Sequence, residues 1–182
     1  MAGDRSAVVS WKAPVFTGGA AITQYVVTAA PGGRSCSTSG AGRSCVVSGL
    51  TAGTQYSFTV TAKNTAGVGV ASSASGKVKA LVAPGKVRDL MMEGVKAGVV
   101  SLSWKAPTPV SAAMGGSAVT GYRVRYGLAG KSEERFTFYA DVKGTSASVR
   151  ALAKGTYYFT VRAINAAGVG DFVLTTKAAK IG

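Results

Sequence analysis

Three arginines and a tyrosine, Arg123, Arg125, Tyr158 and Arg162, form the best candidate binding site in this sequence. Arg123 and Arg125 alternate with apolar residues, so in a β-strand they project to solvent while the apolar residues face the core. Tyr158 and Arg162 have the same parity in a second segment, and pairing of the two segments would put all four on one exposed face. Guanidinium groups beside an aromatic ring suit sugars, phosphates or carboxylates, through bidentate hydrogen bonds and stacking.

Catalytic chemistry has few residues to draw on. The chain contains no histidine, which excludes Ser–His–acid and Cys–His nucleophiles. The neighbouring acids Glu133 and Glu134 would point to opposite faces of a strand rather than act as a glycosidase pair. They also support the alternative interpretation of the arginines as a solvated, neutralised face. Gly67-Val-Gly69 and Gly168-Val-Gly170 lack the helix and lysine of a phosphate loop and are predicted to be turns. We predict no enzyme activity and no cofactor.

The formal charge of +14 favours encounters with anionic partners such as acidic polysaccharides, cell-wall polymers and nucleic acid. Both halves of the chain are basic. The same charge would also keep a glycine-rich protein in solution, which is the plainer explanation. No apolar run is long enough to cross a bilayer, so we predict no membrane span.

The sequence repeats itself: Trp11-Lys-Ala-Pro14 returns as Trp104-Lys-Ala-Pro107, and Phe58-Thr-Val-x-Ala-x-Asn64 returns as Phe159-Thr-Val-x-Ala-x-Asn165. A repeat of this length corresponds to a small domain and not to a solenoid unit. We therefore predict two domains, at residues 1–82 and 83–182.

Alternating apolar and polar residues, as in 56–63, predict half-buried strands of antiparallel sheets, and glycine-rich turns separate them. The stretch 68–79 is also predicted to be a strand. The second repeat has a strand-like stretch, 87–93, before its Trp104, but the first repeat has no equivalent before Trp11. We predict that the first domain lacks its first strand. Either the segment begins one strand late, or the open edge accepts a strand from a partner or from a second copy.

The motifs Leu50-Thr-Ala-Gly-Thr-Gln-Tyr56-Ser-Phe58 to Gly67 and Leu152-Ala-Lys-Gly155-Thr-Tyr157-Tyr-Phe159 to Gly168 resemble the fibronectin type III domain over nearly the whole chain. The resemblance implies an all-β fold of two immunoglobulin-like antiparallel β-sandwiches in series. It implies that Tyr56 and Tyr157 form the tyrosine corner, with a hydroxyl bonded to backbone near the preceding leucine. It implies core roles for the aromatic residues Trp11, Trp104, Tyr25 and Tyr122.

Cys36 and Cys45 lie close together in the first repeat, and we predict a local disulfide in an oxidising compartment, with two free thiols in a reducing one as the alternative. Two cysteines without histidine do not form a zinc site. Their setting in a Ser/Gly-rich hairpin is similar to the secreted bacterial branch of the family. That similarity implies an extracellular or cell-surface location.

Together these features predict a non-catalytic spacer or binding segment of a larger bacterial secreted or cell-surface protein. Its expected partner is a protein or an anionic polysaccharide or cell-wall polymer, and nucleic acid is a weaker candidate. The alternatives are a structural virion component, which would assemble through sandwich contacts, and an accessory module of a polysaccharide-active enzyme.

Overall fold

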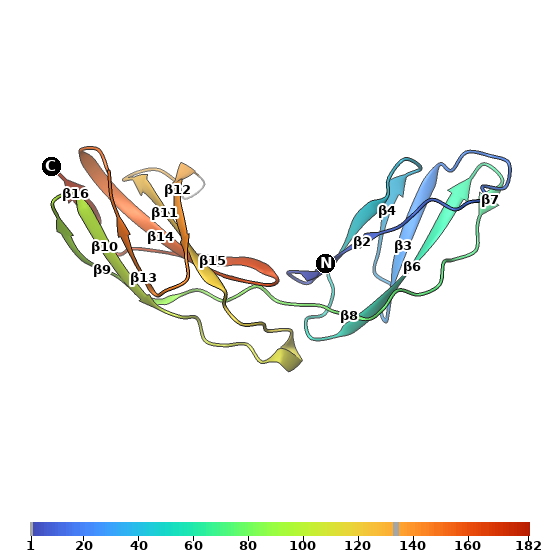
Figure 1. The fold of residues 1–182 in the computed structure, drawn as a ribbon, viewed down its shortest axis with the longest axis horizontal. Coiled ribbons are helices and arrows are strands. Elements are labelled where there is room, and N and C mark those ends of the chain that lie inside the picture. Colours follow the sequence, from blue (N-terminus) through green and yellow to red (C-terminus); the bar gives the residue numbers. More distant parts are fainter. Residues whose placement is uncertain (1, 133–134) are drawn as a thin grey trace. The chain divides into compact units, whose positions relative to one another are not determined.

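The computed structural model describes residues 2–132 and 135–182, in two compact units. The first unit comprises Met1–Val82 and Ser111–Gly116, and the second comprises Ala83–Val110 and Ser117–Gly182. Residues 111–116, which carry a turn of 3-10 helix, η1 (Ala112–Met114), thus group with the first unit although they lie in the second repeat. Each unit is built from two antiparallel sheets, which confirms the predicted β-sandwiches (Figure 1).

One sheet of the first unit has the strand order β1-β2-β5, and the other has the order β4-β3-β6-β7, with β8 also paired to β6. The strand bounds are β1 Ala2–Gly3, β2 Ser6–Ser10, β3 Gln24–Ala30, β4 Ser35–Ser39, β5 Ser44–Ser48, β6 Gln55–Asn64, β7 Gly67–Val68 and β8 Val78–Lys79.

The second unit repeats the plan, with sheets ordered β13-β10-β9 and β12-β11-β14-β15, and with β16 also paired to β14. The bounds are β9 Arg88–Lys96, β10 Val99–Lys105, β11 Gly121–Leu128, β12 Thr137–Val142, β13 Ser146–Val149, β14 Gly155–Asn165, β15 Gly168–Leu174 and β16 Ala179–Ile181.

The two units differ at the strand edges. We predicted no first strand in the first repeat, but the structure has two residues of it: β1 pairs with Ser6 and Ala7 of β2, where the nine-residue β9 pairs with β10 in the second unit. The strand predicted over 68–79 is limited to its two ends, β7 and β8. Between them the hydroxyls of Ser72 and Ser75 accept hydrogen bonds from β6 backbone N–H groups, so side chains replace part of the strand pairing.

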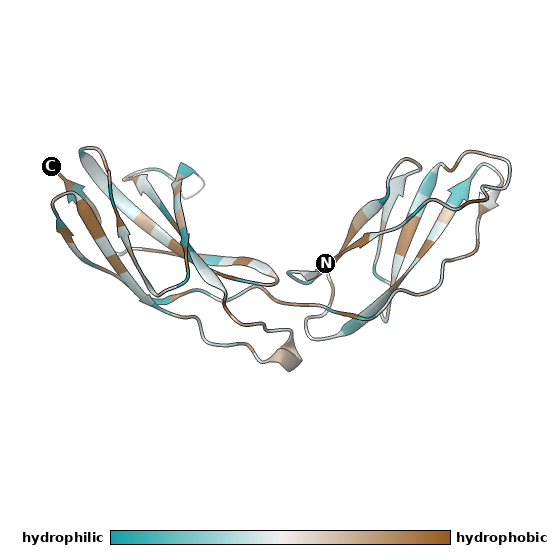
Figure 2. Ribbon diagram, in the orientation of Figure 1, coloured by the Kyte–Doolittle hydropathy of each residue, from teal (hydrophilic) through white to brown (hydrophobic). Residues whose placement is uncertain are grey.

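Apolar side chains from both sheets fill each sandwich, and brown apolar stretches alternate with paler or teal ones along the strands in Figure 2. In each unit a tryptophan packs on a tyrosine at 5.4 Å between ring centroids, Trp11 on Tyr25 and Trp104 on Tyr122. Trp104 is buried, whereas Trp11 is half-buried against the core. Burial raises the pKa of the Tyr122 hydroxyl.

The residues assigned to the tyrosine corner, Tyr56 and Tyr157, are buried in their respective cores. The Thr51 backbone N–H donates a hydrogen bond of 2.9 Å to the Tyr56 hydroxyl oxygen, one residue beyond Leu50. That bond favours the phenolate and lowers the pKa of Tyr56. The Tyr157 ring packs edge-on against Tyr126 at 5.9 Å.

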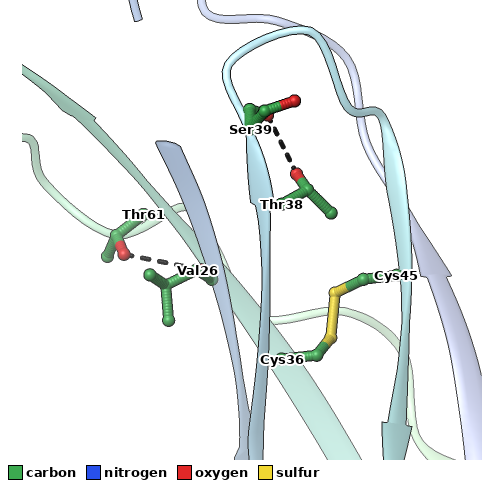
Figure 3. The surroundings of a disulfide bond; sticks show 6 residues. All are labelled: Val26, Cys36, Thr38, Ser39, Cys45 and Thr61. Carbon is green, nitrogen blue, oxygen red and sulfur yellow. Dashed lines mark hydrogen bonds between the residues drawn. A yellow bond between two sulfur atoms is a disulfide. The ribbon is translucent and has the colours of Figure 1, made fainter. Parts of the chain in front are cut away.

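A disulfide joins Cys36 of β4 to Cys45 of β5, with Cα atoms 6.2 Å apart (Figure 3). Because β4 and β5 belong to different sheets, the bond links the two layers of the first sandwich. Both cysteines are partly buried against the core. In the second unit Ala147 aligns with Cys45, and it too packs against the core.

Candidate anion-binding face

Strands β11 and β14 place the predicted arginines on one face of the second unit. Tyr122 and Val124 are buried, so Arg123 and Arg125, which alternate with them, point away from the core. Arg162 of β14 lies directly across from Arg123 in the antiparallel register. Thr160 lies opposite Arg125 and is fully buried, so the longer side chains around it cover the sheet surface there.

Arg123 is held by a carboxylate and by an aromatic ring. Its Nε and one terminal nitrogen donate to the two carboxylate oxygens of Asp141 at 2.9 and 2.8 Å, and its guanidinium lies 5.6 Å from the Phe138 ring centroid. The paired guanidinium lowers the pKa of Asp141, and the hydrogen-bonded carboxylate raises the pKa of Arg123. Both side chains remain about 40% exposed, at 37% for the arginine and 43% for the aspartate.

The other two arginines also have fixed surroundings. The Arg162 guanidinium lies 5.3 Å from the centroid of Phe172, its cross-strand neighbour on β15. A terminal nitrogen of Arg125 donates to the Phe136 carbonyl at 2.6 Å. The exposed face therefore carries four aligned side chains across neighbouring strands. An aromatic ring on β12 is followed by a guanidinium on β11, a guanidinium on β14 and an aromatic ring on β15. We call Phe138, Arg123, Arg162 and Phe172 the arginine ladder.

A surface cavity of about 480 Å³ lies on this face. Its lining residues are Arg123, Arg125, Phe138, Arg162 and Val169. Three guanidinium groups thus line one hollow, and the guanidinium of Arg123 pairs with the carboxylate of Asp141. Such a site suits carboxylate, sulfate or phosphate groups, which accept hydrogen bonds from guanidinium in its plane.

Tyr158, the predicted aromatic member of the site, alternates with the buried Tyr157 and Phe159 and so faces outward. Tyr158 lies opposite Gly127, two pairs along from Arg125, and does not line the cavity. Phe138 and Phe172 occupy the position beside the guanidinium groups instead. Glu133 and Glu134, the acids that we expected to neutralise the face, lie outside the described residues.

The corresponding face of the first unit carries no arginine ladder. The positions there are Val26, Thr28, Ser57 and Thr61, and the Thr61 hydroxyl donates to the Val26 carbonyl at 3.4 Å (Figure 3). The sandwich fold alone therefore does not account for the arginines, which belong to the second unit.

Within residues 2–132 and 135–182, no helix is long and apolar enough to cross a membrane. In the same part of the chain no three His, Cys, Asp or Glu side chains gather as a metal site would require.

Among solved structures, the FN1–FN3 domains of chicken CNTN1 match with a TM-score of 0.68 at 22% identity, over 99% of this chain and 63% of that one. The two-domain fibronectin type III segment of chicken tenascin matches at 17% identity with a TM-score of 0.44, covering 100% of this chain and 95% of that one. The twitchin kinase region of C. elegans matches at 27% identity with a TM-score of 0.47, covering 54% and 17%.

The first of these matches supports the fold, and the chain spans less than two thirds of that structure's length. The fibronectin type III domain family matches residues 2–78 and again residues 85–177, which together make up most of the chain. The two matched ranges contain the two copies of the internal repeat. The chain therefore belongs to the fibronectin type III family, and it carries two such domains in tandem.

Proposed function

We propose that this chain is a non-catalytic binding segment of a larger bacterial secreted or cell-surface protein, with domains at 1–82 and 83–182. Its second domain holds the anionic groups of a polysaccharide or cell-wall polymer. The observation that carries this proposal is the cavity where Arg123, Arg125 and Arg162 meet. Tandem fibronectin type III domains are consistent with a spacer or binding role, and the arginine ladder adds a ligand chemistry to it.

The construction of the ladder favours binding over mere solvation. A ring against each of two guanidinium groups restricts their rotamers, so less side-chain entropy is lost when an anion binds. The Asp141 carboxylate fixes Arg123 in the same way. A solvated face of arginines would need neither ring nor carboxylate in register.

The charge and the disulfide support the rest of the proposal. A net charge of +14 attracts an anionic polymer over a distance set by the ionic strength. The bond between Cys36 and Cys45 persists in an oxidising compartment, and fibronectin type III domains are commonly extracellular. A repeating polyanion also offers several groups to one surface, which compensates for weak single contacts.

The test measures binding of the full chain to immobilised polygalacturonate and dextran sulfate, with neutral dextran as a blank. Arg162→Gln removes a charge from the cavity, and Arg150→Gln removes the same charge from an exposed position after β13 in the opposite sheet. At physiological salt we expect Arg162→Gln to weaken binding several-fold more than Arg150→Gln. Equal losses would mean that only net charge matters, and would contradict a site. Binding to single-stranded oligonucleotide in preference to both polysaccharides would replace the ligand class.

A further inference from the structure

The tetrapeptide Ala-Gly-Val-Gly follows β6 in the first unit and β14 in the second, and its surroundings differ between the two. Residues 66–69 are all exposed, whereas Ala167 and Gly170 of the second copy are buried. The backbone pairing is the same in both copies, with Asn64 opposite Gly67 and Asn165 opposite Gly168. The difference therefore comes from what lies over the turn and not from the turn itself.

In the second unit, Pro84 lies over the turn. A Cβ atom built on Gly170 would be 2.1 Å from the Pro84 carbonyl oxygen and 3.0 Å from its carbon. Pro84 is itself buried. The chain that enters this unit thus passes so close to Gly170 that only glycine fits. A Cβ atom built on Gly69 would contact one atom of the described residues, the Ala62 carbonyl oxygen. The distance of 3.4 Å is an ordinary van der Waals contact.

The uncovered turn of the first unit borders a groove of about 400 Å³. Apolar side chains line it, among them Phe16, Val68 and Val70, which are 83%, 68% and 98% exposed. Exposed apolar clusters of this kind mark interaction sites on soluble proteins. None of the described residues that line the groove is charged, in a chain whose net charge is +14.

The groove is formed without a ligand because one side chain ties its two walls together. The Asn64 side-chain amide donates to the Thr17 carbonyl at 2.7 Å, and its oxygen accepts from the N–H groups of Ala66 and Gly67 at 2.9 and 3.1 Å. In Figure 1 the loop that follows β2 runs beside β7 at one end of the first unit. A preformed groove loses little conformational entropy on binding.

We propose that this groove binds an extended, uncharged, proline-containing peptide segment of a partner polypeptide. The segment Ala80-Leu-Val-Ala-Pro-Gly85 has this chemistry, and its Pro84 occupies the matching position over Gly170. An uncharged groove excludes charged peptides because burial would leave their charges unpaired. Proline-containing segments are already extended before binding and dock in apolar grooves lined by aromatic rings, for which Phe16 is available. This site is independent of the arginine ladder.

The test uses the full ¹⁵N-labelled chain and the acetylated, amidated peptide Ala-Leu-Val-Ala-Pro-Gly at millimolar concentrations. We expect fast-exchange NMR shifts at the backbone amides of Gly67, Val68 and Gly69. Gly69→Ala should weaken binding about tenfold or more, since its methyl group occupies the space that the segment needs. Gly76→Ala is the matched control, because its Cβ would meet nothing within 4 Å.

Three results would overturn the proposal. The first is the absence of shifts in the wild-type chain at millimolar peptide. The second is an equal affinity of the Gly69→Ala and Gly76→Ala chains, both of which should keep the wild-type spectrum away from the site of change. The third is a set of shifts at Gly67–Gly69 that depend on protein concentration without peptide, which would assign the groove to a second copy of the chain.

Discussion

Breaking the disulfide between Cys36 and Cys45 should destabilise the first domain and leave the second unchanged. The bond links β4 to β5 and so joins the two sheets of the first sandwich. In the second domain Ala147 aligns with Cys45, so that domain has no such cross-link. One chain therefore contains both the test and its internal reference.

The magnitude follows from the loop that the bond closes. The two cysteines are nine positions apart, and a closed loop of about ten residues corresponds to about 2.7 kcal/mol of lost chain entropy in the unfolded state. For a domain of about 80 to 100 residues, each kcal/mol shifts the melting temperature by about 4–8 °C. The double variant Cys36→Ala, Cys45→Ala should therefore melt about 10–20 °C lower in its first domain.

The assay is differential scanning calorimetry of the oxidised wild type, of the wild type in reductant, and of the double variant. We expect one transition to move down in the last two samples and the other to stay. Hydrogen exchange at Tyr25 and Tyr122, which lie in the two separate cores, assigns each transition. Unchanged transitions, together with two titratable thiols in protein from its native source, would refute both the cross-link and the extracellular location that rests on it.

Three smaller perturbations test the remaining contacts. Tyr56→Phe removes the acceptor of a backbone N–H and should cost about 1 kcal/mol; an unchanged denaturation midpoint would rule out the tyrosine corner. Gly170→Ala places a methyl group against the Pro84 carbonyl and should cost about 1–3 kcal/mol, and a neutral effect in urea titration would mean that this segment yields easily. Asp141→Asn should cost about 0.2–1 kcal/mol at neutral pH, given the exposure of its pair with Arg123. The folded-state pKa of Asp141 lies below its ordinary 3.8. That difference in stability is therefore complete above about pH 5 and should vanish as the pH falls through the folded pKa; a constant difference would refute the pairing.

The sequence predicts the sandwich strands where burial alternates over many residues. Strands such as β6 and β14, with ten and eleven residues, have enough repeats of inward and outward positions to be recognised. Strand β4 reads Ser-Cys-Ser-Thr-Ser and shows no clear apolar alternation, and β16 alternates over only three residues, which are too few to be recognised. The overlong strand prediction over 68–79 has a related cause. Ser72 and Ser75 fit a strand pattern and donate their backbone N–H groups to β6, yet the return hydrogen bonds from β6 go to their hydroxyls.

The sequence predicts that the arginines of the candidate site share one face, but it does not predict which side chains contact them. Parity along two strands is enough to bring Arg123 and Arg162 to one face. Pairing with Asp141 and Phe138 depends instead on the register of β12, which shifts at a bulge between Val124 and Arg125. A one-residue shift moves every later side chain of the strand relative to its neighbours. Sequence parity cannot locate such a bulge.

Because the two domains share one fold, comparing them separates the features that the fold requires from those that it does not. The tryptophan–tyrosine pair of the core is the same in both, with the same 5.4 Å spacing, because both sandwiches must bury the same apolar faces. The differences lie at the surface: an arginine ladder where the first unit has uncharged residues, and an open groove at Gly69 where Pro84 covers Gly170. Since the shared fold requires neither feature, the Arg162→Gln and Gly69→Ala variants test whether binding accounts for them.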